Sequence, residues 1–516
     1  MRAESKPSKS LGKTARKGVV WSFLREGVTE VILFPVSMVV ARLLTPAEFG
    51  VAAAVLFFVQ LAARLADLGF NAALVRAKTL SDEQASSVFW ATLGIGSLCC
   101  ASLVALAPWV GRFYEFHDIT TLLRVGALSF LIVPFGSVAG ALLARDNRFR
   151  EQSLVDWCYC LTFAVLSISF AWLGMSYWSL IVARVASHVV QAAARIWLAG
   201  WKVSWSFSSQ ALGDMLSFGL GMQAKRLLDY SANNVDNLIV GKVMGLTALG
   251  FYDKAFSTMN RFLLRLNTGG PSTMFRIFAL MQDDYDRFRR AYRRVMLSAC
   301  LFGLPMLAVL VVAAPELMVV LFGPNWLPAA GPFRVLGIAG MFRLLNSYAS
   351  SAIQAFGKVW MEVFSQLAYV TLIAGGVYFA RERGVQGAAE AVLFATAVMS
   401  VLMHGVLRRV TRLSWLEILR PPLPGALCAI GAAGIAALAA AAGQSAFGPM
   451  RPVISLGMQC AAAGIWIVVF LFTFPHEEMR EVVGEAAQDL TPPALRRHRW
   501  LMRWLGAPEA KVSAAR

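Results

Sequence analysis

Apolar runs of about 20 residues recur along the whole chain, and this feature limits the fold more than any other. A run of that length crosses a hydrocarbon core of about 30 Å as a helix. Lipid offers no hydrogen-bonding partner to a bare backbone, so each run must be helical. The composition agrees, because 58% of the 516 residues are hydrophobic and only 15% are charged. A soluble chain of this length would need far more charged surface. The sequence therefore predicts an all-α polytopic membrane protein.

We expect about fourteen membrane-spanning helices joined by short connections. None of the connections is long enough to form a folded domain outside the membrane. The predicted spans cover residues 18–41, 49–75, 86–109, 119–144, 153–173, 176–198, 211–241, 247–274, 292–313, 330–356, 360–380, 386–407, 423–443 and 453–474.

The distribution of Lys and Arg predicts how these spans are oriented. With the N-terminus inside, the two tails and the inner connections, counted together with the span ends beside them, hold 31 of these residues, and the outer connections hold six. Inner loops of membrane proteins are enriched in Lys and Arg, so both termini are predicted to be cytoplasmic. The same bias, together with contacts to anionic membrane lipids, accounts for the net charge of +18. The charge therefore does not indicate a nucleic-acid partner.

The sequence repeats itself at an offset of about 200 residues. The segment 41–50 aligns with 241–250, and further on the offset becomes 210. The aligned positions are Gln60 with Asn260, Asp67 with Asn267, Gly69 with Gly269, Arg76 with Arg276, Arg124 with Arg334, and Arg148 with Lys358. Internal repeats are typical of transporters. We therefore predict two lobes of six helices each, related by the repeat and suited to alternating access, followed by two additional helices.

These boundaries divide the chain into five predicted regions. The regions are a basic cytoplasmic tail (1–17), an N-terminal lobe with spans 1–6 (18–200), a C-terminal lobe with spans 7–12 (201–412), the two additional spans (413–475) and a second basic cytoplasmic tail (476–516).

Charged and amide side chains interrupt the apolar pattern on the first two spans of each lobe. A charge at the bilayer centre costs about 2.5–3.5 kcal/mol, so one that is retained usually faces protein or water. On the second span, the polar residues are Gln60, Arg64, Asp67 and Asn71. Their spacings of four, three and four residues would place them on one helical face. We predict that these helices line a central cationic cleft that binds the substrate. Its candidate residues are Arg25, Glu26, Gln60, Arg64, Asp67, Asn71, Lys225, Arg226, Asp229, Asn233, Asp236, Arg261 and Arg265.

A structural alternative is that pairs such as Arg64 with Asp67 only neutralise each other within a helix. That alternative does not explain Arg261 and Arg265, which have no acidic neighbour on their own stripe. Other polar residues give weaker signals. Asp156 and Arg184 lie near predicted span ends, where their side chains can reach the headgroups, and His188 is expected to serve packing.

The sequence gives no sign of a cofactor. The seven cysteines all fall within apolar runs without CxxC spacing, and the five histidines are scattered, so no metal site is expected. No phosphate-binding loop follows a strand, so there is no ATPase. Active transport would therefore draw on a proton or sodium gradient.

Two neighbouring motifs resemble those of a known family. The first is Arg42-Leu-Leu-Thr-Pro-Ala-Glu-Phe-Gly50, with the pattern R-x-L-x-P-x-x-F-G, and the second is Asp67-Leu-Gly69 on the next span. They resemble the polysaccharide transporter family, the oligosaccharide flippase branch of the multidrug/oligosaccharidyl-lipid/polysaccharide exporter superfamily. The resemblance covers nearly the whole chain.

The resemblance implies a function and a location. It implies translocation of undecaprenyl-pyrophosphate-linked oligosaccharide across the bacterial inner membrane for exopolysaccharide or lipopolysaccharide biosynthesis, alongside other polysaccharide assembly proteins. It also implies a transporter and not an enzyme. Related lipid II flippases place functional arginines and acids in spans 1, 2, 7 and 8, where the candidate residues of this chain lie. Arginines in a low-dielectric cleft would suit the negatively charged pyrophosphate.

Three other functions remain open from the residues. A multidrug exporter of the same superfamily would need an acid-dominated cavity, which the excess of basic residues disfavours. A membrane glycosyl polymerase or ligase would need a sizeable outer loop, and every outer loop here is short. A structural scaffold would have no reason to keep charges within its spans.

Overall fold

The structure is a computed structural model that describes residues 9–76, 80–208, 212–213, 227, 230–267 and 270–473. Within these ranges every regular element is a helix, as predicted. The chain forms two compact units, Met1–Asp253 and Lys254–Arg516. These two units do not test the five regions that were predicted from the sequence, and those regions stay a prediction.

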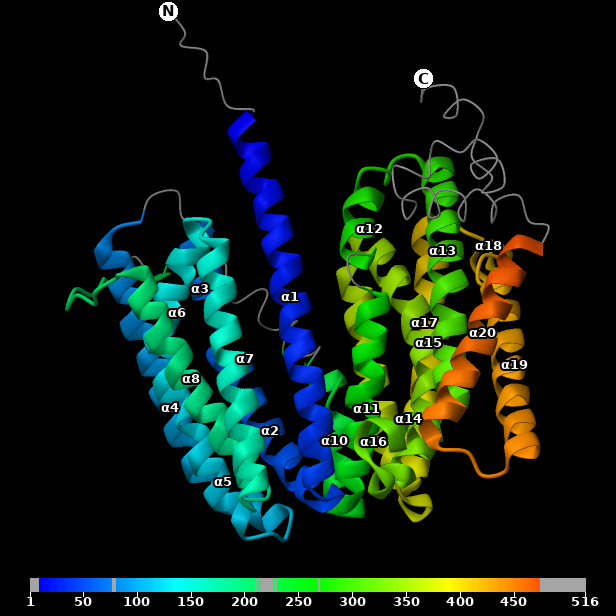
Figure 1. The fold of residues 1–516 in the computed structure, drawn as a ribbon. Coiled ribbons are helices and arrows are strands. Elements are labelled where there is room, and N and C mark those ends of the chain that lie inside the picture. The colour runs from blue at the N-terminus through cyan, green and yellow to red at the C-terminus, as the bar shows by residue number, and fades with distance from the viewer. Residues whose placement is uncertain are drawn as a thin grey trace, which may run out of the picture. The chain divides into compact units, whose positions relative to one another are not determined.

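The first unit consists of long helices and shorter ones between them (Figure 1). Its helices are α1 (Lys9–Leu43), α2 (Pro46–Ala66), α3 (Phe70–Arg76), α4 (Asp82–Phe113), α5 (Asp118–Ala127), α6 (Ser129–Arg145), α7 (Phe149–Trp172), α8 (Trp178–Ala199), α10 (Val235–Met244) and the first two turns of α11 (Leu246–Leu266).

The second unit continues from α11 and ends on a helical hairpin. Its helices are α12 (Gly270–Ala279), α13 (Tyr285–Val312), α14 (Ala314–Phe322), η1 (Pro324–Ala329), α15 (Ala330–Ala355), α16 (Val359–Phe379), η2 (Arg381–Arg383), α17 (Gly384–Thr411), α18 (Trp415–Leu419), α19 (Leu423–Phe447) and α20 (Pro452–Thr473). The last pair, α19 and α20, runs side by side, and α19 also packs on α13 (Figure 1).

Nine helical segments in the described residues are long and apolar enough to cross a membrane. They are Pro46–Ala66, Asp82–Phe113, Asp118–Arg145, Phe149–Trp172, Tyr285–Val312, Val359–Phe379, Arg381–Thr411, Trp415–Phe447 and Pro452–Thr473. Other helices of similar length, such as α1, α8 and α15, carry charged or amide residues along their apolar sequence. The chain is therefore a polytopic membrane protein, while the count of fourteen spans stays a prediction.

The two repeats fold into the same series of helices. In the first, α2 and α3 precede a long α4, a split pair α5–α6, and the hairpin α7–α8. In the second, α11 and α12 precede α13, the pair α14–α15, and the hairpin α16–α17. The packing corresponds as well, because α4 packs on α6 and α6 on α8, just as α13 packs on α15 and α15 on α17. The predicted internal repeat is confirmed at this level.

Several predicted spans are interrupted where the sequence suggested one continuous helix. In span 49–75 the helix stops at Ala66 and resumes at Phe70, so the predicted continuous stripe on this span is wrong. Asp67 N–H donates to the Ala63 carbonyl, and Asp67 Oδ1 accepts a 3.1 Å hydrogen bond from Gly69 N–H. Gly69 has φ +76°, in the left-handed region that favours glycine. Asp67 and Gly69 therefore build a turn between two helices.

Spans 247–274 and 211–241 are also interrupted within the described residues. Asn267 N–H donates to the Leu263 carbonyl one residue after α11 ends. In span 211–241, a turn at Asn233 and Asn234 precedes α10, so the stripe predicted to run through Asn233 is also interrupted. Asn234 Nδ2 donates to the Tyr230 carbonyl. Amide side chains of this kind compete with the helix for backbone groups.

The repeat is most exact where the first turns of α2 and α11 cross. A Cβ on Gly50 would lie 1.7 Å from the Leu246 carbonyl oxygen, and one on Gly250 would lie 1.8 Å from the Pro46 carbonyl oxygen. Gly50 is thus equivalent to Gly250 at the 200-residue offset, and the Pro46 carbonyl is equivalent to the Leu246 carbonyl. Both backbones touch directly, so no side chain fits at either glycine.

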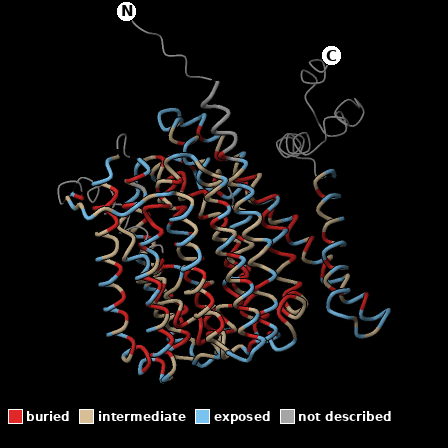
Figure 2. Tube along the Cα trace, turned by 60° about the vertical axis from the view of Figure 1, so that its left-hand side comes forward, coloured by how far each residue is buried: buried red, intermediate tan, exposed pale blue. Residues whose placement is uncertain are grey.

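Exposed residues occur along the length of the helices (Figure 2), and many of them are large and apolar. On the hairpin α19–α20, for example, Leu438 is 69% exposed and Ile465 is 67% exposed. The buried face of this hairpin is held by close contacts: Gly425 packs on the backbone of Cys300, and Trp466 Nε1 donates to the Cys428 carbonyl at 3.2 Å. Such an outer surface suits lipid.

Candidate functional site

The first unit contains two adjoining polar cavities. One has a volume of about 380 Å³ and is lined by side chains from α2, α3, α4, α6 and α8 together with the turn at Asp67. Its polar lining residues are Gln60, Asp67, Asn71, Thr92, Ser129, Ser137, Arg184 and His188. We call this the amide cavity, because Gln60 and Asn71 both face it.

The second cavity has a volume of about 470 Å³ and is lined by α1, α3, α6, α7 and α8. Its polar lining residues are Arg25, Asn71, Arg76, Ser137, Gln152, Asp156 and Arg195. We call this the arginine cavity. Asn71 and Ser137 line both spaces. The two cavities therefore adjoin, and together we call them the polar tract of the first unit.

The helix break at Asp67 positions part of this tract. Gln60, Asp67 and Asn71 do line one cavity, as a common stripe had suggested, but they come from three different local structures: α2, the turn and α3. The packing of α3 against α6 through buried Phe70 and Leu74 fixes the orientation of Asn71. The three residues therefore do lie together, although the continuous helix from which this was predicted is interrupted.

Asp156 is the charged centre of the arginine cavity. Its Oδ2 lies 3.8 Å from Arg25 Nη1 on α1, and its Oδ1 lies 3.7 Å from Arg195 Nη2 on α8. Gln191 Nε2 donates to the same Oδ1 at 3.3 Å. These ion pairs are long, and the side chains involved are 27–34% exposed. Partly solvated pairs of this kind contribute about 1 kcal/mol or less, so a stronger anion can replace the carboxylate.

Two glycines on α6 make room for Arg195. A Cβ on Gly140 would lie 3.3 Å from both Cδ and Nε of Arg195. A Cβ on Gly136 would lie 2.9 Å from the Cα of Ala192, so α6 and α8 approach closely. The stem of Arg195 therefore lies against a smooth stretch of α6 while its guanidinium reaches the cavity.

Helix α8 supplies a polar stripe that the sequence reasoning missed. Arg184, His188, Gln191 and Arg195 are spaced by four, three and four, the pattern that had been noticed on the second span. Because α8 is continuous from Trp178 to Ala199, all four do share one face. Arg184 and His188 line the amide cavity, and Arg195 lines the arginine cavity. The spacing was a usable signal, but the residues near the span ends were assigned to the headgroup region.

Two predicted residues on α1 and α2 lie outside the linings of these cavities. Glu26 is exposed on α1, next to Arg25, which does line the arginine cavity. Arg64 is exposed on α2, and its guanidinium carbon lies 5.9 Å from the centre of the Tyr230 ring. Tyr230 in turn donates from its hydroxyl to the Phe57 carbonyl at 2.9 Å.

Predicted residues from 225 to 236 have varied outcomes. Lys225, Arg226 and Asp229 lie outside the described residues. Asn233 lies in the turn before α10. Asp236 is buried, with its Oδ2 accepting a 2.7 Å hydrogen bond from the Tyr252 hydroxyl and its Oδ1 accepting from Asn237 N–H. It belongs to a polar network between α10 and α11 and to neither cavity lining.

In the second unit, Arg261 and Arg265 both lie on α11. Arg261 is partly buried and Arg265 is exposed. Neither arginine lines the small space near Asn260, where Phe256, Met259, Gly340 and Arg343 leave only about 10 Å³. Arg343 stacks on Phe256, with its guanidinium carbon 5.2 Å from the ring centre.

Comparisons with known proteins identify the family. Residues 39–331 match the model of a family described as polysaccharide biosynthesis protein. The chain is 23% identical to the lipopolysaccharide biosynthesis protein WzxC of Escherichia coli K12 over 391 residues, which are 73% of this chain and 78% of that protein. It is 28% identical to the succinoglycan biosynthesis transport protein ExoT of Rhizobium meliloti 1021 over 339 residues, 64% of this chain and 66% of that one.

Solved structures show the same fold. The lipid II flippase MurJ in an inward closed conformation aligns with a TM-score of 0.66 at 11% identity, over 88% of this chain and 98% of MurJ. An inward-facing multidrug resistance transporter of the MATE family aligns with a TM-score of 0.61 at 15% identity, over 75% and 96%. Since the family model covers more than half of the sequence, the chain belongs to the polysaccharide biosynthesis protein family as a polysaccharide transporter.

Proposed function

We propose that this protein is a flippase that moves an undecaprenyl-diphosphate-linked oligosaccharide from the cytoplasmic to the periplasmic leaflet of the bacterial inner membrane. The functions of its relatives, lipopolysaccharide biosynthesis and succinoglycan transport, support a polysaccharide precursor as cargo. The flippase fold shared with MurJ supports a lipid-linked form of it.

The polar tract of the first unit is the observation that carries the proposal. Its two linings contain four arginines and two aspartates, so the tract favours an anion. A diphosphate would take the place of the Asp156 carboxylate on Arg25 and Arg195, because guanidinium groups bind phosphate oxygens in a planar, bidentate way. The amide cavity would then hold the first sugars, since Gln60 and Asn71 both donate and accept hydrogen bonds.

Alternating access is the proposed mechanism. Each unit contains the same series of helices, so each can move as a body that exposes its polar face to one side and then to the other. Pro134 lies within α6 and Pro305 within α13, and proline inside a helix is a common cause of bending. We place both termini in the cytoplasm on the basis of the Lys and Arg distribution. Coupling to a proton or sodium gradient is part of the proposal.

An exporter of cationic drugs is the second candidate, because a MATE transporter shares the fold. Cation binding requires a carboxylate without a resident counter-ion. In the first unit, Asp156 is already paired with two arginines. The charge balance therefore favours the flippase.

Substitution of the arginine cavity tests the proposal. In cells lacking the chromosomal gene, Arg195→Gln or Arg25→Gln should reduce polymer export about 30-fold, since a hydrogen bond between charged groups contributes about 2 kcal/mol. Lipid-linked oligosaccharide should accumulate in the same cells. Arg261→Ala and Arg265→Ala test the two arginines of α11 that the sequence predicts for the substrate cleft, and they should reduce export as well.

Arg150→Gln is the matched control, because Arg150 is exposed on α7 and lines neither cavity. Membrane levels of all variants are measured by immunoblot. Normal polymer export by the cavity variants together with reduced dye efflux would replace the flippase proposal with the exporter.

A further inference from the structure

The second unit contains an open groove of about 770 Å³ between α16 and α17, closed at one end by α18. It is larger than either cavity of the first unit. Its lining residues are Met361, Phe364, Ser365, Val401, Leu402, Gly405, Val406, Arg408, Arg409 and Trp415. The groove belongs to neither the polar tract nor the residues predicted from the sequence.

One end of the groove is positively charged, and the rest of its length is apolar. On α17 the apolar residues from Val401 to Val406 form the floor, and Arg408 and Arg409 follow in the last turn. Val401 is 66% exposed and Phe364, which faces it from α16, is 69% exposed. The apolar part extends about 10 Å from the arginines at 1.5 Å per residue. Its open side can therefore accept hydrocarbon chains from the surrounding bilayer.

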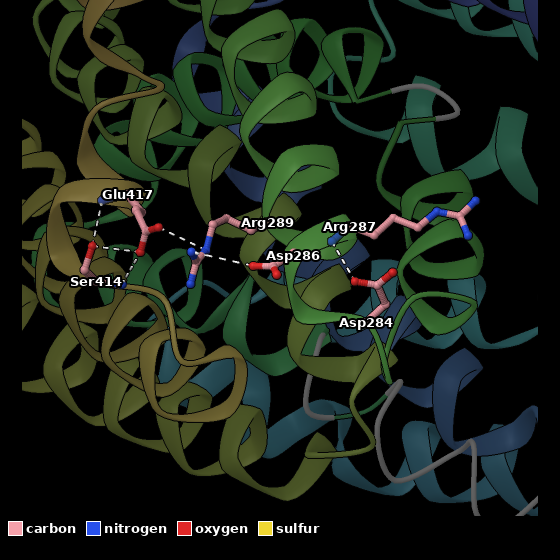
Figure 3. Close-up of polar contacts among 6 residues, drawn as sticks. All are labelled: Asp284, Asp286, Arg287, Arg289, Ser414 and Glu417. Carbon is pink, nitrogen blue, oxygen red and sulfur yellow. Dashed lines mark hydrogen bonds and ion pairs between the residues drawn. The ribbon is translucent and has the colours of Figure 1, made fainter.

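The positive charge at the end of the groove is not neutralised by the nearest acids. Glu417 accepts from Ser414 and forms a 3.0 Å ion pair with Arg289 Nε, so it is turned toward α13 (Figure 3). Glu362 is buried on the other face of α16, where it accepts from Ser350 and Gln354 on α15. The guanidinium carbon of Arg408 lies over the Trp415 ring, 5.7 Å from the ring centre. Two exposed guanidinium groups thus remain at the edge of an apolar floor.

We propose that this groove binds an anionic phospholipid, with the phosphate on Arg408 and Arg409 and an acyl chain along Val401 and Phe364. The arginines lie on the predicted cytoplasmic side, where basic groups between helices bind anionic headgroups. Trp415 is 38% exposed beside them, as expected for an indole at the level of the headgroups. The C-terminal tail is a poor occupant, because its segment 495–505 carries four arginines of its own.

Gly405 provides a way to fill the groove without disturbing the fold. A Cβ on Gly405 meets no heavy atom within 4 Å, so a larger side chain would extend into open space. Gly375 on α16 is equally unobstructed but lies outside the groove. Leucine at these two positions forms a matched pair, one blocking the groove and the other not.

The experiment measures lipid binding to the full chain purified in neutral detergent. The probes are acyl-labelled phosphatidylglycerol, acyl-labelled phosphatidylcholine, and unlabelled undecaprenyl diphosphate as a competitor. Phosphatidylglycerol should bind at least ten times more tightly than phosphatidylcholine. The double variant Arg408→Gln/Arg409→Gln should weaken phosphatidylglycerol binding about 30-fold, on the basis of two headgroup contacts. Gly405→Leu should weaken it at least fivefold, while Gly375→Leu and Arg420→Gln should leave it unchanged.

Three results would overturn the proposal. Equal binding of both phospholipids would mean that the groove is a non-selective apolar slot. Displacement by undecaprenyl diphosphate at a tenfold lower concentration than phosphatidylglycerol itself requires would make it part of the substrate path. Unchanged binding in Gly405→Leu and in the double variant would place the lipid elsewhere. The assay contains no transport step, so its outcome is independent of the proposed flippase activity.

Discussion

Gln60 in the first repeat and Asn260 in the second lie at equivalent positions, yet their surroundings differ greatly. Gln60 lines a cavity of about 380 Å³, whereas the space beside Asn260 measures about 10 Å³. The helices around both residues correspond one to one. The side chains around the two residues can therefore be compared position by position.

Two substitutions between the repeats account for much of this difference. Val59 and Val133 line the amide cavity, and at the 200- and 210-residue offsets their equivalents are Met259 and Arg343. Both replacements are longer side chains that occupy the space the valines leave open. Close packing is the ordinary state of a protein interior, so the retained cavity in the first repeat is the one that suggests a ligand.

The equivalence of the two repeats can be tested most severely at the crossing of α2 and α11. Gly50→Val and Gly250→Val should each prevent folding, because a Cβ would overlap a carbonyl oxygen at less than 2 Å. Relieving this overlap requires backbone movement, which costs about 3 kcal/mol or more. The measurement is thermal unfolding of the purified protein in detergent.

Gly434→Val is the control for this prediction, because a Cβ there meets no heavy atom within 4 Å. Its melting temperature should stay within a few degrees of the wild type. If only one of the two crossing variants unfolded, the two-fold equivalence of this contact would be refuted.

The cavity difference itself can be removed by giving the first repeat side chains that are similarly long to those of the second. Val59→Met combined with Val133→Met should fill the amide cavity and lower polymer export about tenfold, because the first sugars would lose their binding space. The reverse change in the second repeat, Met259→Val, should alter export less than twofold. Polymer released per cell is the measurement, corrected for the amount of transporter in the membrane. Equal losses from both changes would show that the filled site is as important as the open one.

The fold was largely predictable because it depends on features that are local in sequence. Apolar length gave the membrane helices, and the aligned segments around Gly50 and Gly250 gave the repeat. The breaks were not predicted, because the hydrophobic pattern continues across Asp67 and only the left-handed Gly69 reveals the turn. A turn that lies between two apolar segments leaves no gap in the pattern.

Only part of the site was predictable, because the sequence does not reveal which residue a charged side chain pairs with. Arg25, Gln60, Asp67 and Asn71 were identified and do line the cavities. Asp156 lies near a predicted span end, and its sequence neighbours do not reveal its two arginine partners, which lie on other helices. Ion pairs between helices depend on packing, which a single-helix argument cannot include.

Asp156 distinguishes the two basic sites of the molecule and gives the smallest of the predicted effects. The arginine cavity contains this internal anion, whereas Arg408 and Arg409 in the groove are not paired with Glu417 or Glu362. Asp156→Asn removes the competitor for Arg25 and Arg195, so inorganic diphosphate should bind about threefold more tightly, in keeping with two weak, partly solvated ion pairs. Calorimetric titration of the purified protein measures the change, and Glu151→Gln, which removes an acid paired with Arg148 on the same helix, is its control. Weaker diphosphate binding by Asp156→Asn would mean that the carboxylate orients the arginines, and that its competition with the substrate is the lesser effect.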